Sequence, residues 1–261
     1  MRALSLTMLG FFAAVAAAQD AAAPAFEVVS VKPSAMQNGA YGIALATFPG
    51  GRILGNMVPL DYFISQAFDI QMFQIAGGPR WIHEDRWDIE AKPPAGSKAS
   101  QAHPRMWKLP PTADVRLMMQ ALLADRFHMK WHRESKEGPV YLLTRTNREL
   151  KLKESADKEE YPWVGSVAGG AIAWDGLRGT NVTMAEMASR LSNVLNRPVL
   201  DRTGLEGAFD FQYVLDKNGD TDTDRISALM ASVAGLGLKL EAGRGPVETL
   251  VIDAVEKPSG N

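Results

Sequence analysis

The stretch that decides the fold is Val58-Pro-Leu-Asp-Tyr-Phe-Ile-Ser65, because Val182-Thr-Met-Ala-Glu-Met-Ala-Ser189 repeats its apolar pattern. Both stretches are typical of a helix start. Proline at position 59 suits a first helical turn, and Thr183 with Glu186 is predicted to form a capping box. Apolar residues recur every three or four positions, which gives each predicted helix one buried face. An internal repeat of this kind constrains the fold before any single motif does.

Further elements match in the same order after each helix. A glycine-containing turn leads to an alternating strand, 86–92 or 208–214, in which Asp88 and Asp210 follow an aromatic residue. Helices are predicted over 114–126 and 224–234, and closing strands flank a Gly-Pro-Val sequence in each copy. The sequence therefore predicts an α+β fold of two tandem β-α-β-β-α-β-β modules, each a small sheet with two helices on one face.

The expected boundaries follow from composition. The first module, with its N-terminal strands, is predicted over residues 26–147, and the second over 176–257. Residues 148–175 begin with a mixed-charge run and end rich in glycine, which is typical of a solvated linker.

The N-terminus predicts export. Arg2 is followed by an apolar run and by Ala16-Ala-Ala18, so residues 1–18 are typical of a cleaved signal peptide. The run is too short and alanine-rich for a membrane span, and later segments carry charges. We expect a periplasmic or secreted protein that does not insert into a membrane after cleavage.

Composition excludes several classes of function. The chain has no cysteine, which excludes disulfides, thiolate metal sites and a cysteine nucleophile. Its 28 basic residues nearly balance 30 acidic ones, and they form no basic run suited to nucleic acid. No phosphate loop or dinucleotide fingerprint occurs, so no cofactor is expected.

One loop is a candidate binding site. Gly77, Gly78, Pro79, Arg80 and Trp81 combine turn-forming glycines with two residue types that anchor interfaces. The functional interpretation is a recognition loop. The alternative is an ordinary turn whose Trp81 packs into the core.

Two histidine or carboxylate patterns raise the question of a metal. His128 and His132 would share a helix face, but the segment is predicted to be a strand, in which such residues lie about 13 Å apart. Asp220, Asp222 and Asp224 alternate, but the loop lacks the glycine and glutamate of a calcium-binding loop. We expect no metal site, although the sequence leaves open a weak cation site at the three aspartates.

No catalytic residue can be identified from the sequence. An alternative function is a hydrolase whose acid and base come from scattered carboxylates such as Glu84, Asp85 and Asp88. Another is a structural or stress-related exported protein. Arg126 and Arg202 each follow an aspartate and are expected to tie loops to the sheet by ion pairs or carbonyl contacts.

The motifs together resemble a known bacterial family. They are Phe26-Glu-Val-Val-Ser-Val-Lys-Pro-Ser34, Gly77-Gly-Pro-Arg-Trp81, Leu122-Leu-Ala-Asp-Arg-Phe127, Lys136-Glu-Gly-Pro-Val-Tyr141, Asp201-Arg-Thr-Gly-Leu205 and Val251-Ile-Asp253 through Glu256-Lys-Pro-Ser259. The chain resembles the soil-associated family, abundant in Acidobacteria, that is called domain of unknown function 3738. The resemblance implies an exported bacterial protein and carries over no catalytic residue.

A second resemblance concerns the fold. Residues 184–253 are similar to the secretin and TonB short N-terminal domain, through Gly204-Leu-Glu-Gly207, Gly237-Leu-Lys-Leu240 and Leu250-Val-Ile-Asp253. That resemblance implies a periplasmic protein-binding module. We therefore expect a non-catalytic envelope binding or interaction module that takes a partner protein or peptide by strand addition to an exposed sheet edge.

Overall fold

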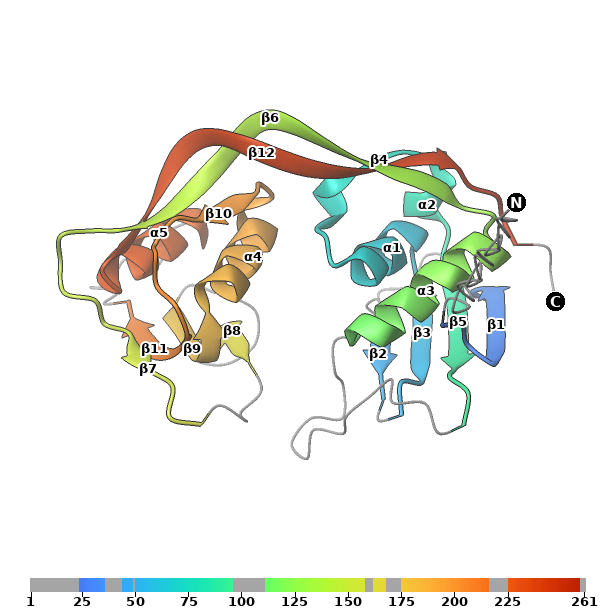
Figure 1. Cartoon of the computed structure of the whole chain (residues 1–261), viewed down its shortest axis with the longest axis horizontal. Helices are drawn as coiled ribbons and strands as arrows, with labels where there is room; N and C mark the ends of the chain where they lie inside the picture. The colour runs from blue at the N-terminus through green and yellow to red at the C-terminus, as the bar shows by residue number, and fades with distance from the viewer. Residues whose placement is uncertain are drawn as a thin grey trace, which may run out of the picture.

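The computed structural model describes residues 24–35, 44–48, 50–95, 111–157, 162–167, 175–215 and 225–258. These residues form a mixed α+β fold of two lobes that are joined by one long two-stranded β-ribbon (Figure 1). The proposed signal peptide and the three aspartates at 220–224 lie outside the described residues. No helix in the described ranges is long and apolar enough to cross a membrane.

The first lobe contains a four-stranded antiparallel sheet in the order β1-β5-β3-β2. Its strands are β1 (Val28–Pro33), β2 (Ala44–Thr47), β3 (Ile53–Val58) and β5 (Trp87–Lys92). Its helices are α1 (Leu60–Phe68), the short α2 (Trp81–Glu84) and α3 (Ala113–Arg126), with a 3-10 turn η1 (Met72–Gln74). Helices α1 and α3 pack together on one side of this sheet (Figure 1).

The second lobe has the corresponding sheet in the order β7-β11-β9-β8. Its strands are β7 (Lys153–Glu154), β8 (Trp163–Gly165), β9 (Gly176–Thr183) and β11 (Ala208–Val214). Its helices are α4 (Met184–Leu195) and α5 (Arg225–Gly235), and the predicted capping box of Thr183 and Glu186 is confirmed at the start of α4.

A third sheet joins the lobes. Strands β6 (Lys130–Arg145) and β12 (Leu238–Ala254) pair antiparallel along their whole length, with Gly138 opposite Gly245. The short β4 (Ile75–Gly77) adds to β12 in the first lobe, and β10 (Val199–Asp201) adds to β6 in the second. Each long strand therefore begins in one lobe and ends in the other, which forms the arch of Figure 1.

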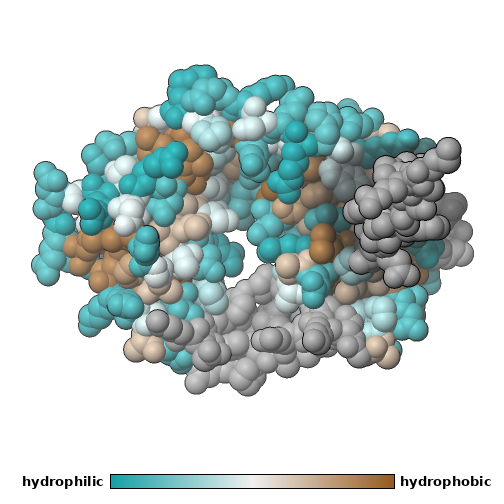
Figure 2. Space-filling view, viewed as in Figure 1, coloured by the Kyte–Doolittle hydropathy of each residue, from teal (hydrophilic) through white to brown (hydrophobic). Residues whose placement is uncertain are grey.

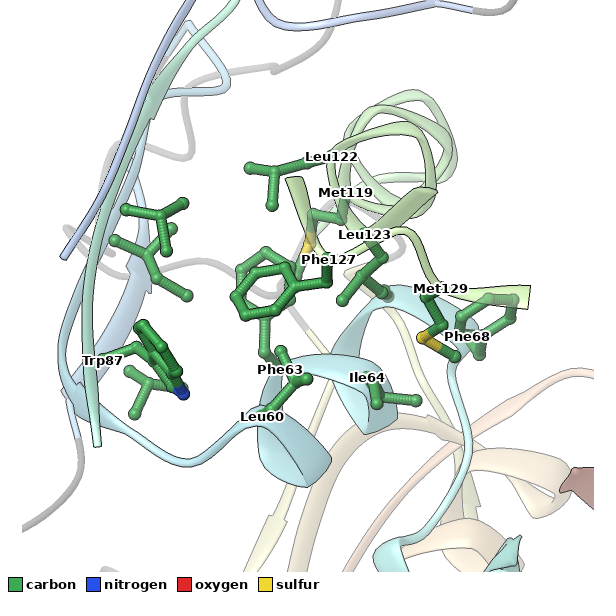
Figure 3. Packing of buried hydrophobic residues seen from close by; sticks show 14 of the residues in the cluster. Leu60, Phe63, Ile64, Phe68, Trp87, Met119, Leu122, Leu123, Phe127 and Met129 are labelled. Carbon is green, nitrogen blue, oxygen red and sulfur yellow. The ribbon is translucent and has the colours of Figure 1, made fainter. Parts of the chain in front are cut away.

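Two hydrophobic clusters form the cores. In the first lobe Trp87 and Phe127 meet edge to face with ring centroids 5.5 Å apart, beside Leu60 and Phe63 of α1 (Figure 3). Leu250 and Ile252 of β12 belong to this cluster. The second cluster gathers α4, α5 and β11 and includes Leu143 of β6. Each core therefore includes residues of the ribbon that come from the other half of the chain.

Both lobes contain the same irregularity in their central strands. The pairing of β3 with β5 shifts between Gly55 and Val58, and that of β11 with β9 shifts between Phe209 and Phe211. Bulges of this kind add a residue to one strand and increase its twist. Here the bulged strands are β3 and β9, and each leads directly into a helix.

The structure departs from the predicted modules in two respects. The strands expected before and after each Gly-Pro are one continuous strand. Among the described residues, the middle of the ribbon consists only of β6 and β12, so a proline without an N–H need not interrupt a ladder there. Residues 148–175 also differ from a solvated linker, because they supply β7 and β8, and Ser155 and Ser166 are buried.

Candidate functional site

The cleft between the two lobes is the main candidate site. Its walls come from α1 and η1 of the first lobe and from α4 and β8 of the second, and its volume is about 570 Å³. Figure 2 shows an opening between the lobes. Both walls belong to lobes that share strands of the same ribbon.

One side chain bridges the walls of the cleft. The amide Nε2 of Gln71 donates to the backbone oxygen of Ser189 at 3.3 Å and lies 3.4 Å from its hydroxyl. Gln71 is itself held by the 3-10 turn, since its backbone N–H donates to Oε1 of Gln74 at 3.0 Å. Gln74 in turn donates to the backbone oxygen of Glu248 on the ribbon at 2.9 Å. These contacts connect the first wall to both the second wall and the arch.

The charges on the walls do not all cancel. Arg116 pairs with Asp69 at 2.8 Å, and Glu186 is occupied in capping α4 through Thr183. Arg190 is exposed and has no ion pair to a carboxylate among the described residues. Its charge is close enough to act on Tyr62: burial raises the pKa of the Tyr62 hydroxyl, and Arg190 opposes part of that rise.

Apolar surface lies beside this charge. Met72 remains 50% exposed, and Phe73 and Trp163 are half-buried at the cleft. Strand β8, which carries Trp163, pairs with β9 on one side and is an edge of its sheet in the described residues. The cleft therefore has a cationic side chain, apolar surface and one strand edge. These features suit the binding of another molecule.

The sequence-predicted loop lies outside this cleft. Gly77 ends β4 and Gly78 follows with φ of 75°. A Cβ on Gly77, also at φ 75°, would lie 2.7 Å from the backbone oxygen of Ile252, so the contact with β12 requires a glycine here. Pro79 and Arg80 lead into α2, and Arg80 is highly exposed and paired with Glu84.

Trp81 is partly buried, so it is neither fully exposed for recognition nor fully packed into the core. It packs edge to face against Trp87 with centroids 6.2 Å apart, and the Lys257 ammonium lies 5.7 Å from its ring. The loop thus has a structural role through its glycines and Trp81. A recognition role for Arg80 stays a prediction.

The structure shows the contacts of the three carboxylates proposed for hydrolysis. Glu84 pairs with Arg80, Asp85 pairs with Lys257 at 2.6 Å, and Asp88 accepts the backbone N–H of Met57 at 3.0 Å. Each has a local structural partner.

The two histidines of the candidate metal pattern each contact a carboxylate. His132 lies on β6 as predicted and contacts Asp253 at 2.9 Å, whereas His128 precedes the strand and lies 3.7 Å from Glu256. No group of three or more potential ligands suited to a metal occurs in the part of the chain described here.

Sequence reasoning missed the cleft residues. On α4 they are Ala185, Glu186, Ser189, Arg190 and Asn193, the polar face opposite the buried one. A polar helix face is ordinarily solvated, so the pattern alone does not mark a site. The pairing of this face with η1 appears only when the two lobes are placed around the ribbon.

The fold and cleft define a two-lobed α+β protein without cysteine, built on a shared β-ribbon. The chain belongs to the family described as a protein of unknown function, DUF3738, whose model matches residues 61–255. No curated protein and no solved structure matched the chain.

Proposed function

We propose that the protein is an exported, non-catalytic binding module that holds an extended peptide in the cleft between its lobes. The observation that carries this proposal is the edge strand β8, which borders the cleft through Trp163 and Val164. A peptide that adds a strand at this edge would gain main-chain hydrogen bonds and would lie within the cleft.

The side chains of the cleft favour a particular peptide chemistry. Arg190 would pair with an acidic side chain, and an arginine–carboxylate contact is stronger than one between neutral groups. Met72 and Phe73 would contact apolar side chains of the same peptide. Successive side chains of a strand point to opposite faces, so a peptide that alternates acidic and apolar residues fits both surfaces.

Other features support the remaining parts of the proposal. The apolar N-terminal run with Arg2 and Ala16-Ala-Ala18 supports export to the periplasm or beyond the cell. The local partners of Glu84, Asp85 and Asp88 favour a non-catalytic protein. The family match gives no activity for comparison.

We also propose that the two halves descend from one duplicated module. The strand orders β1-β5-β3-β2 and β7-β11-β9-β8 correspond strand for strand. Ser34 donates its backbone N–H to Arg86 at 2.8 Å, and Ser155 donates its own to Ala208 at 2.9 Å, at corresponding places in the two sheets. On this plan residues 148–175 belong to the second module.

The test is fluorescence anisotropy with two short labelled peptides, one alternating Glu with Leu and one alternating Lys with Leu. The acidic peptide should bind, and Arg190→Gln should weaken it roughly tenfold, because one charge-assisted contact is lost. Arg52→Gln is the matched control, since Arg52 is exposed on the first lobe away from the cleft. Equal binding of both peptides, or an unchanged affinity in Arg190→Gln, contradicts the proposal.

A further inference from the structure

A second concavity lies at the far end of the ribbon, in the second lobe. Its volume is about 410 Å³, and it is lined by Arg145, Arg148 and Arg202 together with Thr146, Asn147 and Thr203. It shares no lining residue with the interlobe cleft. Three arginines at one small opening are unexpected in a chain whose formal net charge is -2.

Strand pairing explains why these arginines meet. Strands β6 and β10 run parallel, with Val199 opposite Tyr141 and Asp201 opposite Leu143. Parallel strands end at the same edge of a sheet, so the residues after each strand come together. Arg145 ends β6, Arg148 follows it in the chain, and Arg202 comes directly after β10.

The backbone around the arginines is held in place. Arg202 donates its N–H to the oxygen of Leu143 at 2.8 Å. Thr146 donates its hydroxyl to Gly237 at 2.9 Å and accepts the N–H of Arg148 at 3.2 Å. Buried Thr203 donates its hydroxyl to Asp201 at 2.8 Å. These bonds fix the loops that carry the guanidinium groups.

Two carboxylates near the pocket have partners of their own. Asp201 accepts both the hydroxyl and the backbone N–H of Thr203 through Oδ1. Arg202 is tied to the sheet by its backbone bond to the carbonyl oxygen of Leu143. Glu241, which accepts from Thr144 at 3.2 Å, pairs with Lys239 at 2.7 Å. Arg145, Arg148 and Arg202 have no ion pair to any carboxylate in the described ranges.

Several arginines elsewhere in the described residues have a partner, although Arg190 of the cleft has no ion pair. Arg80, Arg116 and Arg133 pair with carboxylates. Arg52 and Arg197 lie over aromatic rings. The concentration of three uncompensated guanidinium groups at one concavity therefore calls for an external anion.

We propose that this concavity, the three-arginine pocket, binds a phosphate-type oxyanion carried by a free phosphate or by a lipid headgroup. Guanidinium groups present planar forks of N–H donors that match phosphate oxygens, and three of them suit a group with more than one negative charge. The pocket is open to water, so binding should weaken as salt is raised.

Isothermal titration with inorganic phosphate and pyrophosphate tests the free anion. Sedimentation with phosphatidylcholine vesicles, with and without phosphatidic acid, tests the headgroup. The double variant Arg145→Gln/Arg202→Gln should weaken binding about tenfold or more, whereas Arg52→Gln/Arg244→Gln, which removes the same charge elsewhere, should retain it. Arg190→Gln should also retain it, which separates this site from the cleft.

Nuclear magnetic resonance of the wild-type protein tests the pocket without any variant, so the test does not depend on whether the variants fold. The bound anion should shift the amide signals of Arg148 and Thr203. Binding in either arm with this dependence supports the proposal and identifies the source of the phosphate. The absence of binding in both arms, or an equal loss in the two double variants, overturns it.

Discussion

The carboxylate of Asp210 accepts a hydrogen bond at 2.8 Å from the backbone N–H of Asn181, a residue with φ of 49°. In the first lobe Asp88 accepts the N–H of Met57, whose φ is 54°, at 3.0 Å. Both N–H groups lie at a bulge where the regular ladder is interrupted. The aspartates therefore supply the acceptor that the ladder does not, at the point where each strand turns into its helix.

This role makes Asp210→Ala destabilising. The partly buried N–H of Asn181 would lose its acceptor, which costs about 1–3 kcal/mol in the free energy of unfolding. Asp210→Asn keeps a carbonyl oxygen at the same place and should retain most of the stability. Urea denaturation of the two variants beside the wild type measures the difference. Equal stability of the alanine and asparagine variants would show that the hydrogen bond has no such role.

Gly77→Ala should also destabilise the protein, by more than Gly204→Ala. Both glycines have positive φ, 75° and 66°, so both alanines share the backbone cost of about 1 kcal/mol. Only at Gly77 would the new Cβ collide with backbone, the oxygen of Ile252, since Gly204 has nothing within 4 Å. Thermal unfolding of the two variants compares them, and equal losses would mean that β4 moves away from β12 without cost.

The contribution of His132 should depend on pH. Hydrogen bonds to Asp253 and then to Glu134 raise the pKa of His132. The folded state therefore favours the protonated ring, and its stabilisation is fully present below the ordinary histidine pKa of about 6.5. It is lost as the pH rises through the raised pKa of the folded state.

His132→Gln should accordingly destabilise the protein more at about pH 5.5 than at about pH 8.5. The side chain is exposed, so the effect should be small and should decrease in high salt. Urea denaturation of variant and wild type at both pH values measures it. A larger loss at the alkaline pH would contradict the sign of the shift.

Filling the cleft should block binding without loss of stability. Ala185 is exposed on the wall formed by α4, so Ala185→Trp places a large ring in the cleft while the core stays intact. Ala231→Trp, at an exposed position of α5, is the matched control. The affinity for the alternating Glu–Leu peptide should fall at least about tenfold in the first variant only. An unaffected affinity in Ala185→Trp would place the peptide elsewhere.

Local signals in the sequence predict much of each lobe. Helix α4 begins at the predicted capping box of Thr183, because this motif acts within a few residues. Helix α3, predicted from Asp114, begins at Ala113, after its cap at Thr112. The aromatic-Asp pattern correctly indicates the strands that contain Asp88 and Asp210. Such features depend on neighbours in sequence, and a sequence can therefore report them.

The ribbon and the cleft depend instead on contacts between residues that are far apart in the sequence. Gly138 pairs with Gly245, and β4 and β10 each join the long strand of the other half. No periodicity within β6 indicates that its last residues complete the second lobe. The cleft follows from this exchange, so its residues, such as Gln71 and Arg190, carried no local signal of their shared surface.

Amide hydrogen exchange with the alternating Glu–Leu peptide tests the central claim most directly. The account predicts slower exchange for the amides of Trp163, Val164 and Gly165 in β8 when the peptide is bound, since its main chain would cover that strand edge. Unchanged exchange in β8, with protection confined to the outer strand β1 of the first lobe, would contradict binding in the cleft.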